Sequence, residues 1–117
     1  MKKILVVDDC STNRLLVDKL LERIKLEIMV FQAVNGEEAV KMCENDDFDL
    51  ILMDLQMPVL NGVEAATIIK DIKPNIAIFS MTAININCYD TSMFDGIMQK
   101  PFSITAFENN IKQIIGK

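Results

Sequence analysis

The chain of 117 residues contains no histidine, and this absence limits the chemistry that it can perform. A serine-histidine-aspartate triad and a histidine-ligated metal site are both excluded. The sequence also lacks any run of about 20 apolar residues, the length that a helix needs to cross a bilayer. Only four apolar residues follow Met1-Lys2-Lys3 before two aspartates, so we expect neither a signal peptide nor a membrane segment.

The sequence has no cysteine motif for a metal and no cluster of basic residues. The three cysteines are an odd number and lack the spacing of metal ligands, so we expect reduced thiols and a cytoplasmic location. The net charge is −5 and no basic run occurs, which argues against direct binding to nucleic acid. The same charge is consistent with an acidic site that attracts a cation.

Apolar runs alternate with segments of helical periodicity along the whole chain. The runs cover residues 4–7, 28–33, 50–53, 76–81 and 97–99. Their length and continuity are typical of strands that are buried on both faces of a parallel sheet. The alternation predicts one α/β domain over residues 1–117, a three-layer doubly wound (βα)5 fold. Asparagine and other poor helix formers predict only a short or irregular helix within residues 84–96.

The first helical segment has a predicted start and a regular apolar pattern. Ser11 or Thr12 follows the first strand and is expected to cap the helix. Leu16, Leu20 and Ile24 recur at helical spacing, with Leu15 and Leu21 beside them, and this periodicity predicts an amphipathic helix against the sheet.

Polar side chains stand where each apolar run ends. These residues are Asp8, Asp9, Asp54, Thr82 and Lys100. In an open α/β sheet the carboxyl ends of the strands face one crevice, so these side chains are expected to converge there. Each pair of carboxylates about 5 Å apart would repel by roughly 3 kcal/mol. Either a retained proton or a divalent cation must offset this charge, and oxygen ligands suit Mg²⁺ or Mn²⁺.

Such a crevice has the groups that phosphoryl transfer requires. An ionised carboxylate beside a metal can act as a nucleophile. A phosphoryl group between metal, lysine and hydroxyl would find a charge or a hydrogen bond for each of its oxygens. Each residue taken alone also has an ordinary structural interpretation as a polar turn, a solvated lysine or a helix cap. The joint arrangement favours the site.

Several short motifs occur in order at the predicted strand ends. They are Val6-Val7-Asp8-Asp9, Met53-Asp54-Leu55-Gln56-Met57-Pro58, Gly62, Thr82-Ala83 and Lys100-Pro101-Phe102. On these residues the chain resembles the receiver domain of two-component response regulators over essentially its whole length. Asn13-Arg14 and residues 54–64 are most similar to receivers of hybrid histidine kinases. The resemblance implies a flavodoxin-like parallel sheet with strand order 2-1-3-4-5.

The resemblance also implies a phosphoacceptor and a metal site. Asp54 would receive a phosphoryl group from the phosphohistidine of a histidine kinase or phosphotransfer protein. Asp9, Asp54 and the backbone carbonyl of Gln56 would ligate Mg²⁺, and Asp8 would act mainly through water. The chain would catalyse its own phosphorylation and dephosphorylation and would turn over no free substrate.

Two further residues receive roles from the same resemblance. Lys100 would pair with the phosphoryl group, and Thr82 would donate a hydrogen bond to one of its oxygens and shift the loop that follows. The family's output surface, formed by its fourth and fifth helices and the fifth strand, would then bind a downstream protein.

The sequence departs from the family at two places in this switching apparatus. Ile97 stands three positions before Lys100, where the family usually has an aromatic switch residue. Lys100 follows Thr82 by 18 positions, about four fewer than expected, or roughly one helical turn. An alternative is therefore a receiver-like interaction module with impaired switching.

The reaction and the parent protein each have a second interpretation. A phosphohydrolase of the haloacid dehalogenase type is less favoured because that class needs Asp-x-Asp, and Cys10 occupies the required position. The start at Met1 favours a stand-alone regulator, whereas the motifs shared with hybrid kinases favour a piece of a larger kinase.

Overall fold

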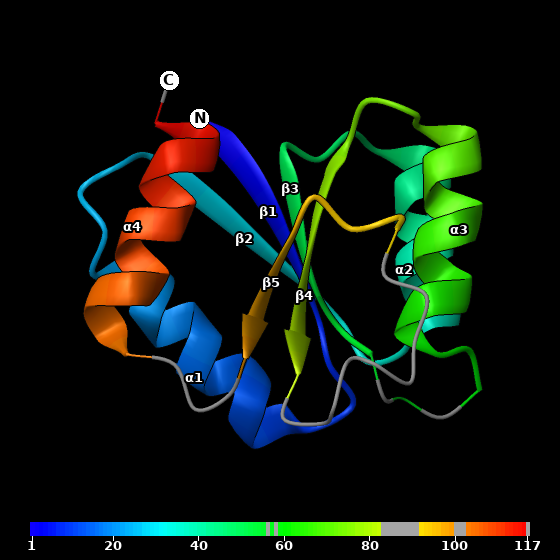
Figure 1. The fold of residues 1–117 in the computed structure, drawn as a ribbon, viewed down its shortest axis with the longest axis horizontal. Coiled ribbons are helices and arrows are strands. Elements are labelled where there is room, and N and C mark those ends of the chain that lie inside the picture. The colour runs from blue at the N-terminus through cyan, green and yellow to red at the C-terminus, as the bar shows by residue number, and fades with distance from the viewer. Residues whose placement is uncertain (56, 58, 83–91, 100–102, 117) are drawn as a thin grey trace.

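The strands form a single parallel sheet. A computed structural model describes residues 1–55, 57, 59–82, 92–99 and 103–116. This part of the chain contains β1 (Lys2–Val7), β2 (Ile28–Ala33), β3 (Leu50–Asp54), β4 (Ala77–Thr82) and β5 (Gly96–Gln99). The sheet order is β2-β1-β3-β4-β5 with every pair parallel (Figure 1). This order confirms the flavodoxin-like topology, and the strand positions agree with the apolar runs.

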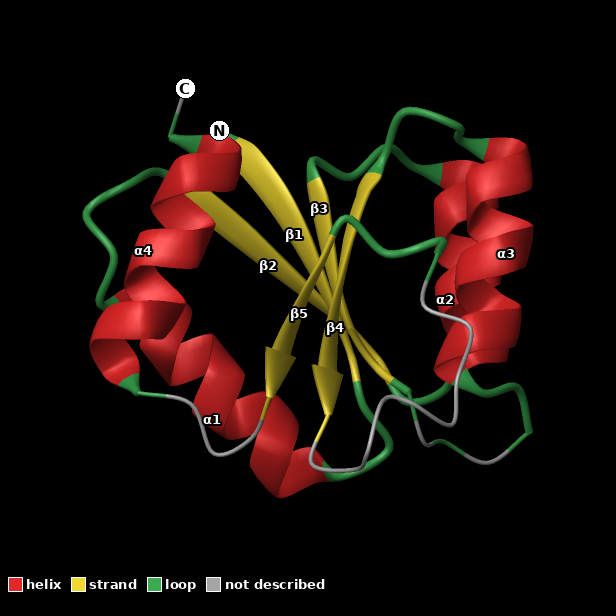
Figure 2. Cartoon of the chain, in the orientation of Figure 1, coloured by secondary structure: helices red, strands yellow, loops and turns green. Residues whose placement is uncertain are grey.

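Helices cover both faces of the sheet and produce three layers. The described helices are α1 (Ser11–Glu22), α2 (Gly36–Asn45), α3 (Gly62–Ile72) and α4 (Ile104–Ile115). Figure 2 shows α1 and α4 on one face of the sheet and α2 and α3 on the other. Most of the segment expected to form a short or irregular helix lies outside the described residues. None of the described helices has the length and hydropathy to cross a membrane.

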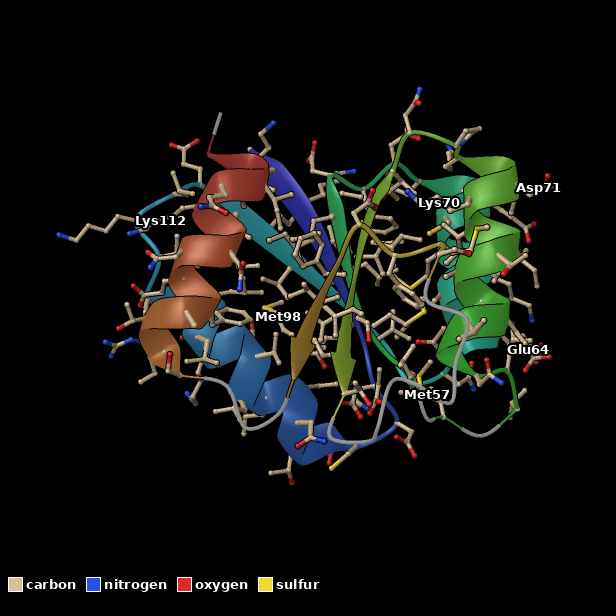
Figure 3. All side chains as sticks on the ribbon, viewed as in Figure 1. Met57, Glu64, Lys70, Asp71, Met98 and Lys112 are labelled. Atoms are coloured by element: carbon tan, nitrogen blue, oxygen red, sulfur yellow. The ribbon has the colours of Figure 1, made fainter. Side chains whose placement is uncertain are left out.

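The inner strand β1 explains why the apolar runs are continuous. Ile4, Leu5, Val6 and Val7 are all 0% exposed. Leu5 and Val7 join the core on the side of α2 and α3, whereas Ile4 and Val6 join the core on the side of α1 and α4. The second core also contains Met98 of β5, which lies between the sheet and these helices (Figure 3). A strand buried on both faces needs apolar residues at every position.

Side-chain caps set the starts of three helices. Asn61 and Glu64 form a reciprocal capping box at α3, in which the Glu64 N–H donates to Asn61 Oδ1 at 2.9 Å. Asn35 caps α2 and accepts from the Glu38 N–H at 2.8 Å. Ser103 caps α4 and accepts from the Ala106 N–H at 3.0 Å. Each cap satisfies a backbone donor that the helix leaves unpaired.

The start of α1 differs from the prediction, and only some of its apolar residues face the sheet. Cys10 is the N-cap residue, and its side chain makes no capping hydrogen bond, so the assignment of the cap to Ser11 or Thr12 is wrong. The face toward the sheet contains Val17, Leu20, Leu21 and, just past the helix, Ile24. Leu16, which shares the same helical periodicity, is 53% exposed. It precedes Val17 by one position, which turns its side chain by about 100° around the helix.

Candidate functional site

Three carboxylates meet at the carboxyl ends of two inner strands. Asp8 and Asp9 directly follow β1, and Asp54 is the last residue of β3. These strands are neighbours, with Val7 opposite Met53, so both chains reach the same edge of the sheet. One carboxylate oxygen from each acid lies within 4.8 Å of the others. Residues far apart in the sequence thus come together, as predicted from their positions at the carboxyl ends of parallel strands.

The three acids differ in their burial. Asp8 is 1% exposed, Asp54 is half-buried and Asp9 is exposed. The backbone of Asp8 continues the sheet, because its N–H donates to the Ala33 carbonyl at 3.2 Å. Its Oδ1 accepts a hydrogen bond from the Cys10 N–H at 3.0 Å. The site therefore has a buried floor at Asp8 and an open side at Asp9.

The donor set fits a hard divalent cation. It consists of carboxylate oxygens, the ligands that Mg²⁺ and Mn²⁺ prefer. Three negative charges at this separation repel one another by about 3 kcal/mol per pair. Because Asp9 is exposed and Asp54 is half-buried, a cation could approach from solvent and keep part of its hydration shell.

A second group of acids, at the opposite edge of the sheet, is paired with lysines. The Lys3 Nζ donates to Asp46 Oδ1 at 2.8 Å, and Lys73 makes a similar contact with Asp47. The hydrogen bond from Lys3 holds the pKa of the Asp46 carboxyl below its usual range. These ion pairs connect β1 and the end of α3 to the segment after α2. The acids at this edge therefore have a structural role in holding these elements together.

The remaining predicted site residues are only partly described. Thr82 ends β4 and is 1% exposed, and its neighbour in the strand, Met81, lies opposite Asp54. Ile97 lies on β5 and is 36% exposed. Gln56 and Lys100 lie outside the described residues, so their predicted roles stay predictions.

Arg14 is a neighbour of the site that the sequence identifies only as part of a motif. Its side chain reaches from the first turn of α1 to the ends of two strands. Nη1 donates to the backbone carbonyl of Asp8 at 2.6 Å, and Nε donates to Gln32 Oε1 of β2 at 3.1 Å. In the sequence, the only indication of this role is that Arg14 lies near the start of the helix that follows the acids. Periodicity alone does not predict its contact with the Asp8 carbonyl.

Comparison with known proteins gives consistent matches along the chain. Residues 4–112 match the family model described as the response regulator receiver domain. The autoinducer 1 sensor kinase/phosphatase LuxN of Vibrio campbellii is 34% identical, over 97% of this chain and 14% of that protein. The chemotaxis protein CheY of Halobacterium salinarum is 33% identical, over 97% of both chains. The chain thus spans a small part of the sensor kinase and nearly all of CheY.

Solved structures agree with the sequence matches. The response regulator TrrA of Thermotoga maritima, solved in complex with Mg²⁺-BeF, superposes with a TM-score of 0.89. The two sequences are 31% identical, and the alignment covers 98% of this chain and all of TrrA.

Proposed function

Because this chain belongs to the response regulator receiver domain family, we propose that Asp54 is its phosphoacceptor. The family assigns the chain to two-component signal transduction. The observation that carries the proposal is the cluster of Asp8, Asp9 and Asp54, with carboxylate oxygens within 4.8 Å of one another. Asp54 ends the central strand β3 and is half-buried, so its carboxylate is held by the sheet and remains reachable.

The proposed metal site comprises Asp9, Asp54 and the backbone carbonyl of Gln56, with Asp8 contributing through water. Mg²⁺, or Mn²⁺ in its place, would offset the carboxylate repulsion and polarise the oxygens of an incoming phosphoryl group. The three clustered carboxylates support this assignment, and so does the Mg²⁺-BeF complex of TrrA, a relative of 31% identity.

The proposed reaction moves one phosphoryl group from nitrogen to oxygen. A carboxylate oxygen of Asp54 attacks the phosphorus of a phosphohistidine on the partner, the P–N bond breaks, and a P–O bond forms. The histidine nitrogen keeps the electron pair of the broken bond and takes up a proton. Lys100 would pair with the transferred group, and Thr82 would donate a hydrogen bond to one of its oxygens. In this proposal the chain catalyses its own phosphorylation and dephosphorylation and turns over no free substrate.

Partners and location follow from the same proposal. The phosphodonor would be a histidine kinase or a phosphotransfer protein in the cytoplasm, consistent with a relative that is itself a sensor kinase/phosphatase. The output target would bind the surface around β5 and its neighbouring helices. The new charge on Asp54 would shift the balance between two conformations of that surface.

Ile97 favours a second candidate, an interaction module that is phosphorylated but switches weakly. It lies on β5 in the family's aromatic switch position and is 36% exposed. A branched aliphatic side chain cannot move an aromatic ring between a buried and an exposed position. Nuclear magnetic resonance shifts of β5 and α4 that stay unchanged on phosphorylation would favour this candidate over a switching receiver.

Phosphorylation of the whole 117-residue chain tests the main proposal. We expect incubation with Mg²⁺ and a small acyl phosphate donor to add one phosphoryl group by intact-protein mass spectrometry. Asp54→Asn should show no gain. Asp71→Asn is the control because it removes an exposed carboxylate from the outer side of α3 (Figure 3). A wild-type chain that gains no mass, or an Asp54→Asn chain that still does, would overturn the proposal.

A further inference from the structure

The guanidinium of Arg14 connects three elements next to the carboxylate cluster. The residue lies in the first turn of α1, and its side chain is half-buried. Nη1 donates to the Asp8 carbonyl at the end of β1, and Nε donates to the Gln32 side chain near the end of β2. The contact of 2.6 Å with Asp8 is short, as expected when a charged donor meets a carbonyl.

The Asp8 carbonyl belongs to the peptide unit that joins Asp8 to Asp9. This planar unit includes the bond to the Asp9 nitrogen, so holding its oxygen restrains ψ of Asp8 and φ of Asp9. Those two torsions set the directions of both side chains. The Asp8 N–H is already held by Ala33 of β2 at 3.2 Å. The Arg14 contact therefore restrains the one peptide that orients two of the three clustered carboxylates.

The start of α1 shows why such an anchor is needed. The N-cap residue of this helix, Cys10, makes no side-chain capping hydrogen bond, whereas the N-cap residues of α2, α3 and α4 do. The backbone N–H of Arg14 makes the first helical hydrogen bond, to the Cys10 carbonyl at 3.1 Å. Its side chain then ties this turn to the strand ends. The turn from β1 to α1, which contains both acids, is thereby fixed from the helix side.

We propose that Arg14 is a positioning residue that orients Asp8 and Asp9 for the divalent cation, with Gln32 holding its guanidinium in place. This inference rests on the proposed function, because it assigns a purpose to the same carboxylates. A planar guanidinium can donate to both acceptors at once, whereas a lysine ammonium is a compact point charge on a flexible stem. Geometry is therefore required in addition to positive charge.

Mg²⁺ binding by the whole chain, measured by isothermal titration calorimetry, tests the proposal. We expect both Arg14→Gln and Arg14→Lys to weaken Mg²⁺ affinity by about 10-fold, as is typical when a group that orients metal ligands is lost. Arg23→Gln is the matched control, since it removes a second arginine that follows α1 and contacts Glu108 of α4. That variant should bind Mg²⁺ like the wild type.

The lysine variant separates positioning from charge. If only charge mattered, Arg14→Lys would equal the wild type, and Arg14→Gln would bind the cation more tightly because a repelling charge is gone. That result would overturn the proposal.

A purely structural role of Arg14 is tested by thermal unfolding without metal. A lower melting temperature of Arg14→Gln with unchanged Mg²⁺ affinity of the folded protein would also overturn it.

Gln32→Ala decides the question if the Arg14 variants fail to fold. Gln32 is exposed on the edge strand β2, so its truncation should leave the fold intact. Weaker Mg²⁺ binding by this variant supports the proposal, and unchanged binding overturns it.

The behaviour of the wild type separates the failure of the proposed function from the failure of the Arg14 inference. A wild-type chain that neither binds Mg²⁺ nor accepts a phosphoryl group overturns the proposed function as well, whereas a competent wild type with unaffected Arg14 variants overturns this inference alone.

Discussion

Gly62 lies directly against the backbone of Asp54. A methyl group at position 62 would lie 2.8 Å from the Leu55 Cα and closer still to the Asp54 carbonyl oxygen. The Gly62 N–H also donates to the Leu55 carbonyl at 2.9 Å. The first residue of α3 therefore fixes the chain that carries the proposed phosphoacceptor, and only glycine has room there.

The first prediction concerns Gly62→Ala. Overpacking should lower the free energy of unfolding by about 1–3 kcal/mol. Displacement of Asp54 should also slow phosphorylation by roughly 10-fold or more, because small shifts of reacting groups are costly. Urea unfolding and the rate of mass gain with a small phosphodonor measure the two effects. Gly36→Ala is the control, since its methyl would meet Leu60 and Ala65 instead. Equal slowing in both variants would contradict the prediction.

The second prediction concerns a strained residue in the loop after Asp54. Val59 has φ of 71° and is 74% exposed, so it holds a left-handed conformation that suits a β-branched residue poorly. Val59→Asn should raise the free energy of unfolding by about 1 kcal/mol. The midpoint of urea unfolding measures this gain. Ile68→Asn, an exposed change within α3, should instead destabilise slightly, because asparagine is a poorer helix former. A less stable Val59→Asn chain would refute the prediction.

The third prediction concerns a buried hydroxyl. Ser80 of β4 is 0% exposed, and its Oγ has no hydrogen-bond partner among the described residues. Removing an unpaired buried polar group recovers its desolvation cost, so Ser80→Ala should leave stability unchanged or raise it by up to about 1 kcal/mol. The same change at Ser103 removes the α4 cap and should cost about 1 kcal/mol. Chemical denaturation of both variants provides the comparison. Destabilisation at Ser80 by as much as at Ser103 would argue against the prediction.

The fourth prediction concerns pH. Burial raises the pKa of the Cys43 thiol from 9.0 to about 11, and the charge of Lys73 opposes this shift only in part. The folded state thus retains the thiol proton where the unfolded state releases it. This contribution to stability is complete below about pH 9 and is lost as the pH rises toward about 11.

Unfolding curves collected across that interval test the pH dependence. Cys43→Ala should be less stable at neutral pH but should lose less stability than the wild type in alkali. Cys10→Ala is the control because Cys10 is exposed, and it should follow the wild type. An alkaline loss in Cys43→Ala as steep as in the wild type would contradict the assignment.

Local composition and the order of the motifs were enough to predict the sheet and the edge where the acids lie. Strands buried on both faces, such as residues 4–7, leave an apolar signature in one short segment, and parallel pairing then sends Asp8 and Asp54 to the same edge. The motifs in order also identified the family and with it the strand order. These features depend on the residues of short segments and on the rule that parallel strands have their carboxyl ends at the same edge of the sheet.

The groups that support the acids could be identified only once the elements were packed together. The face of α1 toward the sheet begins at Val17 instead of Leu16, because contact with β1 and α4 selects among apolar positions that periodicity leaves nearly equivalent. The contacts of Arg14 with Asp8 and Gln32 join segments from separate parts of the chain. The close approach of Gly62 to Asp54 depends on where α3 packs against the end of β3. Such relationships are distances between elements, and the pattern of residues within one segment does not contain them.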